Sequence, residues 1–114
     1  MRLIKAQNKY HNRRTVLNGL TFDSRKEAAR WQELLLLQRA GYISDLRRQV
    51  KFVLIPSFGD ERAAVYYADF CYTENGANVV EDVKSEATKK DKSYVLKRKL
   101  LKYLFRDIVF REFD

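Results

Sequence analysis

The sequence predicts a small α/β protein with elements in the order helix, three strands, helix, strand. Two stretches with apolar residues at helical spacing flank a pair of strand-like segments joined by Asn75-Gly76, and a further strand-like segment follows the second helix. With 114 residues, the chain is long enough for one domain with a single core. Its 46% hydrophobic content favours a packed globule over disorder.

The N-terminal residues are expected to form a basic arm. Residues 1–14 hold five Lys or Arg and no acid, and they show little apolar periodicity. We interpret them as a flexible arm before a single domain over residues 15–114. A short hairpin around Asn18-Gly19 is expected at the start of that domain, over residues 15–22.

The first long helix is predicted from its capping residues. Ser24 and Glu27 match a capping box, and the helix is expected to run to about Ala40, with Gly41 as its stop. Several of its residues fall on one stripe at helical spacing, namely Glu27, Trp31, Leu34, Leu35 and Gln38. Glu27 is therefore expected at the start of the side that faces the core.

Three strands follow this helix. The first is predicted over residues 49–55 and is followed by a loop. The second and third form a hairpin, because Asn-Gly best supplies the two positive φ angles of a type I′ turn. If Asn75 and Gly76 are the turn, Asp69 lies directly opposite Asp82.

The C-terminal part of the sequence predicts one helix and one strand. The helix is expected over about residues 91–106, with Tyr94 and Leu101 among its inward-facing residues. The strand is predicted over residues 108–113.

The two opposed aspartates point to a cation site. Like charges directly opposite one another destabilise a sheet, so a fold that accepts them is expected to place a cation between them. Lys84 shares a face with Asp82, whereas Glu81 points to the other face as a surface or inter-element charge. An odd-length loop would shift the register and exchange Glu81 with Asp82. Carboxylates suit Mg²⁺ or Mn²⁺; the alternative is a pair of ordinary strand-end acids.

The spacing of these residues resembles that of a known superfamily. Asp69, followed thirteen positions later by Asp82-Val83-Lys84, resembles the motif of PD-(D/E)XK nucleases, which is an acid, a spacer, and then acid-any-Lys. Ala68 stands where the motif has proline. The chain resembles a small family of phage proteins assigned to that superfamily, and its layout is similar to that of Holliday-junction resolvases and transposon-end nucleases.

The resemblance implies a restriction-endonuclease-like core with a mixed central sheet and a metal-dependent endonuclease activity on DNA. In that case Asp69, Asp82 and the carbonyl of Val83 hold Mg²⁺ or Mn²⁺, and Lys84 orients a water or offsets charge on phosphate. Glu27 looks like the upstream glutamate of many members, as a further ligand or a support for a second metal. A role as helix cap is equally open for it. The expected substrates include branched DNA and recombination or replication intermediates.

The charge of the chain indicates a polyanionic partner. The net charge is +8, and residues 84–106 hold nine Lys or Arg against two acids. Nucleic acid is the leading candidate, although a solvated helix face also explains such a run. The residues expected to contact phosphates are Arg13, Arg14, Lys89, Lys90, Lys92 and Lys97.

Two other functions stay open. One is a non-catalytic nucleic-acid-binding protein on a nuclease fold, and the other is a nuclease subunit that needs a partner. Cutting both strands of DNA favours a homodimer. Its single cysteine, Cys71, fits a reducing compartment, and no apolar run is long enough for a bilayer. The expected location is the cytoplasm, that of the host cell if a phage encodes the protein.

Overall fold

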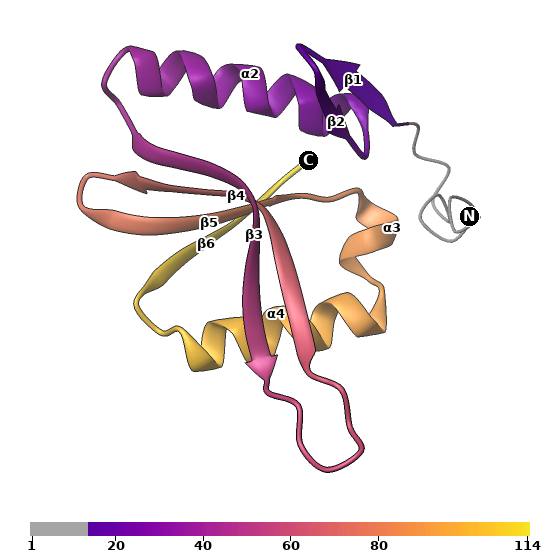
Figure 1. Ribbon diagram of the computed structural model, residues 1–114. Helices are drawn as coiled ribbons and strands as arrows, with labels where there is room; N and C mark the ends of the chain where they lie inside the picture. Colours follow the sequence, from indigo (N-terminus) through magenta and orange to yellow (C-terminus); the bar gives the residue numbers. More distant parts are fainter. Residues whose placement is uncertain (1–13) are drawn as a thin grey trace.

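A computed structural model of the protein describes residues 14–114, so most of the predicted basic arm lies outside the described residues (Figure 1). None of the helices in this described part is long and apolar enough for a bilayer crossing. The elements, labelled as in Figure 1, are β1 (Thr15–Leu17), β2 (Leu20–Phe22), α2 (Arg25–Arg39), β3 (Ser44–Ile55), β4 (Ala64–Glu74), β5 (Ala77–Val83), α3 (Glu86–Lys89), α4 (Lys92–Leu104) and β6 (Ile108–Phe113).

The predicted α/β class and element order are confirmed. Four strands form one mixed sheet in the order β3-β4-β5-β6, in which only β5 and β6 run parallel. Helix α2 and the small β1–β2 hairpin lie on one side of the sheet, and α4 lies on the other (Figure 1). The parallel pairing of β5 with β6 is made through the crossover that contains α3 and α4.

Both Asn-Gly pairs form the turns that the sequence predicts. The φ angles are 51° and 81° at Asn18 and Gly19, and 51° and 80° at Asn75 and Gly76, as a type I′ turn requires. The β4–β5 register is therefore the predicted one, with pairs that run from Glu74 opposite Ala77 to Phe70 opposite Glu81.

The helix boundaries agree with their capping signals. The Ser24 side chain accepts a hydrogen bond from the Glu27 backbone N–H at 3.2 Å, and Gly41 follows the helix with a φ of 87°. Helix α3 was not predicted, because its four residues bury no side chain and so leave no apolar periodicity. Helix α4 is shorter than predicted and buries Tyr94 and Leu101.

Strand β3 begins at Ser44, five residues earlier than predicted. A register shift separates Ser44 from Arg47, and Asp45 between them has a φ of 54°. This irregularity disrupts the alternation from which a strand is recognised in a sequence.

Two separate cores cover the two faces of the sheet. The core beneath α4 consists of Leu54, Tyr66, Ala68, Cys71, Val80, Tyr94 and Leu101. The core beneath α2 consists of Leu34, Ile43, Phe70, Tyr72 and Val79.

Strands β3 and β4 both change faces at one position. Ala68 belongs to the α4 core, whereas Phe70 belongs to the α2 core and stacks on Trp31 of α2 at 5.8 Å. Residues two apart in a regular strand share a face, so β4 must reverse at Asp69. In β3, Arg48 lies over the Phe22 ring on the α2 side, whereas Val50 packs against the α4 core.

The reversal in β3 therefore falls at Gln49, whose φ is 54°. Arg48 pairs with Phe70, and Val50 pairs with Ala68, so Gln49 lies opposite Asp69. Both strands bend sharply near the centre of the sheet (Figure 1).

Candidate metal centre

Asp69 and Asp82 each bind the backbone of the opposite strand. The Asp69 N–H donates to Asp82 Oδ1 at 2.8 Å, and the Val83 N–H donates to Asp69 Oδ2 at 2.9 Å. The β4–β5 pairing ends one position earlier, at Phe70 and Glu81. The carboxylates thus replace the backbone acceptors where the regular ladder stops, and each accepts one backbone N–H of the opposite strand.

The second oxygen of Asp82 is the least satisfied group at this position. Asp82 is fully buried, and its Oδ2 has no hydrogen-bond partner among residues 14–114. The Lys84 Nζ lies 3.9 Å from that oxygen and 5.2 Å from the centre of the Tyr94 ring. Burial raises the pKa of Asp82 to about 6, and the positive charge of Lys84 opposes the shift.

Glu27 enters the same region from the first turn of α2. Its side chain is 3% exposed, and Glu27 Oε2 accepts a hydrogen bond from Gln49 Nε2 at 3.2 Å. The same nitrogen donates to Asp69 Oδ1 at 3.5 Å. Burial, followed by the negative charges of Asp69 and Asp23, raises the pKa of Glu27 to about 8. Burial also raises the pKa of Asp69.

Gln49 is the residue of this cluster that the sequence did not reveal. It was predicted only as the first residue of a strand, and its place opposite Asp69 depends on the β3–β4 register. Residues 56–63, which join these strands, contain no Asn-Gly pair to fix that register. The described side chains at the candidate site are therefore Glu27, Gln49, Asp69, Asp82 and Lys84.

Glu81 points to the other face, so the alternative register with Glu81 in place of Asp82 is wrong. It is fully buried, where Arg30 Nε and Nη2 donate to its two oxygens at 2.6 and 3.0 Å. The Tyr72 hydroxyl donates to the same carboxylate at 2.6 Å. Glu81 is thus an inter-element charge, as predicted, but it is not on the surface.

The lysines expected to contact phosphates lie on the crossover that follows Lys84. Lys89 ends α3, with its Nζ 3.5 Å from Glu86 Oε1, and Lys90 follows it. Lys92 begins α4, and Lys97 lies in its middle. Arg14 precedes β1 and is exposed, whereas Arg13 lies outside the described residues.

The donor set fits a hard divalent ion. Within residues 14–114, Asp82 Oδ2 lacks a hydrogen bond, and Asp69 Oδ1 accepts only the long one from Gln49. Residues 14–114 contain no group of three or more His, Cys, Asp or Glu arranged to surround a metal. Two carboxylates suffice for Mg²⁺, which keeps several waters and also binds substrate phosphate. The carbonyl of Val83, at the end of β5, was expected to add a ligand.

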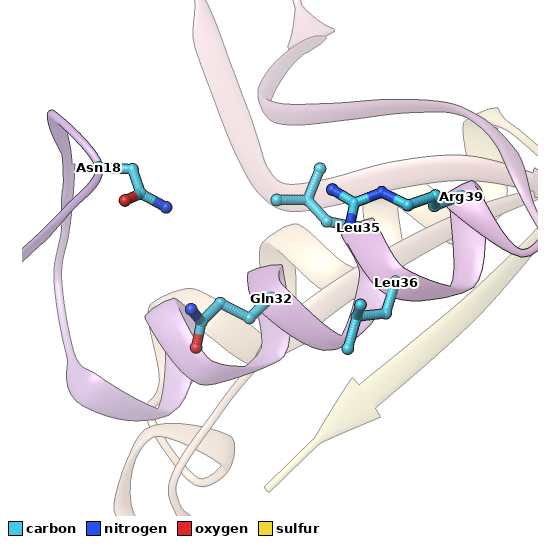
Figure 2. Close-up of a pocket in the computed structure, with 5 residues that line it drawn as sticks. All are labelled: Asn18, Gln32, Leu35, Leu36 and Arg39. Carbon is cyan, nitrogen blue, oxygen red and sulfur yellow. The ribbon is translucent and has the colours of Figure 1, made fainter.

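A separate cavity lies on the outer side of α2. It has a volume of about 320 Å³ and is lined by Asn18, Gln32, Leu35, Leu36 and Arg39 (Figure 2). None of these side chains is a carboxylate, and none belongs to the candidate site. The carboxylate cluster, not this cavity, is therefore the candidate centre for chemistry.

No curated protein and no solved structure matches the chain significantly. One family model matches residues 7–112, a range that includes every described residue of the candidate site. The chain therefore belongs to the family described as "Protein of unknown function (DUF1064)".

Proposed function

We propose that this protein is a metal-dependent DNA endonuclease of the PD-(D/E)XK type. The proposal is supported most by one observation. A backbone N–H of the opposite strand binds one oxygen of Asp69 and one of Asp82, and the second oxygen of Asp82 is buried beside Lys84 with no hydrogen-bond partner in the described part of the chain. A buried polar atom without a partner is costly, and a bound cation would satisfy it.

Each residue of the candidate site has its own role in the proposed reaction. Asp69, Asp82 and the Val83 carbonyl would hold Mg²⁺ or Mn²⁺, which when bound polarises a phosphate oxygen and lowers the pKa of a water. Lys84 would orient the attacking water through a hydrogen bond or offset negative charge on the phosphate. Glu27 would take up a proton or support a second ion. Water adds to phosphorus and the P–O3′ bond breaks, which leaves a 5′-phosphate and a 3′-hydroxyl that takes the proton.

The substrate is proposed to be DNA because of the charge of the chain. The net charge is +8, and Lys89, Lys90, Lys92 and Lys97 lie on the crossover that follows Lys84. They would neutralise backbone phosphates on either side of the cut. The resemblance to resolvases and transposon-end nucleases favours branched DNA and recombination or replication intermediates. One site cuts one strand, so cleavage of both strands favours a homodimer. The proposed location of the protein is the cytoplasm.

A cleavage assay tests the proposal. Wild type, Asp82→Asn and Lys84→Ala are incubated with linear, nicked, flapped and four-way DNA in Mg²⁺ or Mn²⁺. Each variant is expected to lose cleavage by a factor on the order of 10² or more, because a ligand or a charge-stabilising donor is removed. Both are expected to bind DNA as wild type does. Asp60→Asn and Lys99→Ala change exposed residues and serve as matched controls.

The outcomes separate the candidate functions. Cleavage that is unchanged in Asp82→Asn and Lys84→Ala contradicts the proposed site. DNA binding by all three proteins with cleavage by none supports a non-catalytic DNA-binding protein. Activity that appears only when other proteins are added supports a subunit that needs a partner.

A further inference from the structure

Gln49 has a backbone conformation that its residue type does not favour. Among residues 14–114, four non-glycine residues have positive φ, namely Asn18, Asp45, Gln49 and Asn75. The two asparagines lie in type I′ turns, and Asn and Asp are the residues enriched in this region. Gln49 lies in no such turn and is not a residue type that is enriched at positive φ. Such strain persists where the surrounding structure imposes it, and it clusters at functional sites.

The surroundings of Gln49 explain how the strain is imposed. The Arg48 guanidinium donates to the Thr21 carbonyl at 2.7 Å and lies over the Phe22 ring, on the α2 side. Val50 packs on the α4 side. A regular strand would put both residues on one face, so the backbone must reverse at Gln49.

The reversal leaves the amide of Gln49 between two acids from different elements. Its Nε2 carries two hydrogens, and it donates to Glu27 Oε2 at 3.2 Å and to Asp69 Oδ1 at 3.5 Å. The other oxygen of Asp69 accepts the Val83 N–H. Asp69 is thus held at both oxygens, and Glu27 is tied to it.

The chemistry of an amide suits this place. A lysine or arginine at this position would neutralise the carboxylates and compete with a cation for them. A primary amide orients both acids and leaves their negative charge intact.

We propose that Gln49 is a positioning residue that orients Asp69 and Glu27 for a divalent cation, and that the left-handed backbone aims its amide at them. This inference rests on the proposed function and deepens it. It adds to the site a residue that does not itself bind the metal.

Metal binding tests the inference without reference to cleavage. Gln49→Gly accepts the backbone conformation and removes the amide. Asp45→Gly relieves a φ of 54° in the same strand, away from the carboxylates, and is the matched control. Both variants are expected to keep or raise the midpoint of thermal unfolding. Only Gln49→Gly is expected to weaken Mn²⁺ binding in calorimetry, by about 10-fold to 100-fold.

Gln49→Asn provides a second variant should Gln49→Gly fail to fold. Asparagine tolerates positive φ, but its amide is one methylene too short to reach both oxygens, so weaker Mn²⁺ binding is again expected. Equal Mn²⁺ affinity in wild type and variant overturns the inference. An equal loss in Asp45→Gly also overturns it, because the backbone change alone would then be the cause.

The two proposals fail in different ways. A wild type that binds Mn²⁺ but cuts no DNA contradicts the nuclease function, and weaker binding by Gln49→Gly still upholds the role of Gln49. A wild type that cuts DNA, with unaltered Mn²⁺ binding in Gln49→Gly, contradicts the inference alone. A wild type that does not bind Mn²⁺ contradicts both.

Discussion

The protonation of individual carboxyl groups links the candidate site to stability. The pKa of Asp82 is raised to about 6 and that of Glu27 to about 8, both chiefly by burial. The folded state therefore holds these protons more tightly than the unfolded state. Stability from this source is complete below about pH 4 and decreases as the pH rises through 6 and then 8.

This pH dependence is a testable prediction. Without metal, the unfolding midpoint is expected to fall between pH 5 and pH 8, and Mn²⁺ is expected to raise it more at pH 8, where the acids are already ionised. Thermal unfolding in EDTA and in Mn²⁺ measures both effects. Asp82→Asn should make the metal-free dependence shallower. A metal-free midpoint that rises over this pH range is inconsistent with the burial of these acids.

Glu81 shows how much one buried ion pair contributes to the free energy of unfolding. Glu81→Gln leaves Arg30, whose side chain is 13% exposed, without its bidentate counter-charge. The expected cost is about 3–5 kcal/mol, because the buried pair is broken and only the solvent-exposed Glu33 is left near the Arg30 charge. Glu33→Gln is the control, because the same Arg30 lies 3.6 Å from the exposed Glu33. It should cost less than about 1 kcal/mol in urea unfolding.

At the scale of whole elements, two variants at the start of α2 distinguish a helix-capping role from a role in the candidate site. Ser24→Ala removes the acceptor for the Glu27 N–H and should cost about 1 kcal/mol of stability. Glu27→Gln should cost no stability at pH 8, because the Glu27 side chain contacts Gln49 and its charge is unfavourable there. Urea unfolding measures both variants. A loss for Glu27→Gln equal to that for Ser24→Ala would assign the side chain to the cap.

The elements also show what the sequence could predict. The turn at Asn75-Gly76 sets the β4–β5 register through local backbone conformation, so the opposition of Asp69 and Asp82 was predictable. The pairing of β3 is set by packing on both sides of the sheet. The reversal at Gln49 violates the period of two on which predictions of strand faces depend.

The burial of the Glu81 charge could not be predicted from the sequence either. Glu81 lies next to Asp82 in the sequence, and alternation assigned it to the opposite face. Its partner Arg30 is 51 positions away, and only the packing of α2 on the sheet brings them together. Local patterns therefore gave the strand face correctly but not the degree of burial.

At the scale of the whole molecule, the positive charge predicts salt-sensitive DNA binding. A chain with a net charge of +8 that neutralises phosphates should lose affinity for DNA as salt increases. Replacing Lys92 or Lys97 with alanine should reduce the slope of log K against log salt by about 0.9 for each phosphate that the variant no longer neutralises. Fluorescence anisotropy over a range of salt concentrations measures this slope.

Lys26→Ala is the control for the salt dependence. The Lys26 Nζ lies 2.8 Å from Asp114 Oδ1, so its charge is already paired, and its removal should leave the slope unchanged. A slope near zero for wild type contradicts a phosphate-binding role for the basic residues.

The parallel pairing of β5 with β6 has a consequence for how the protein folds. The two aspartates belong to one tight hairpin, which can form within microseconds from neighbouring residues. Lys84, in contrast, has its backbone N–H bonded to the Phe113 carbonyl at 2.9 Å, an interaction that forms only after the long crossover closes. During folding, Asp69 and Asp82 should therefore meet before the backbone of Lys84 is anchored, so the amine is the last of these three groups to be fixed in position.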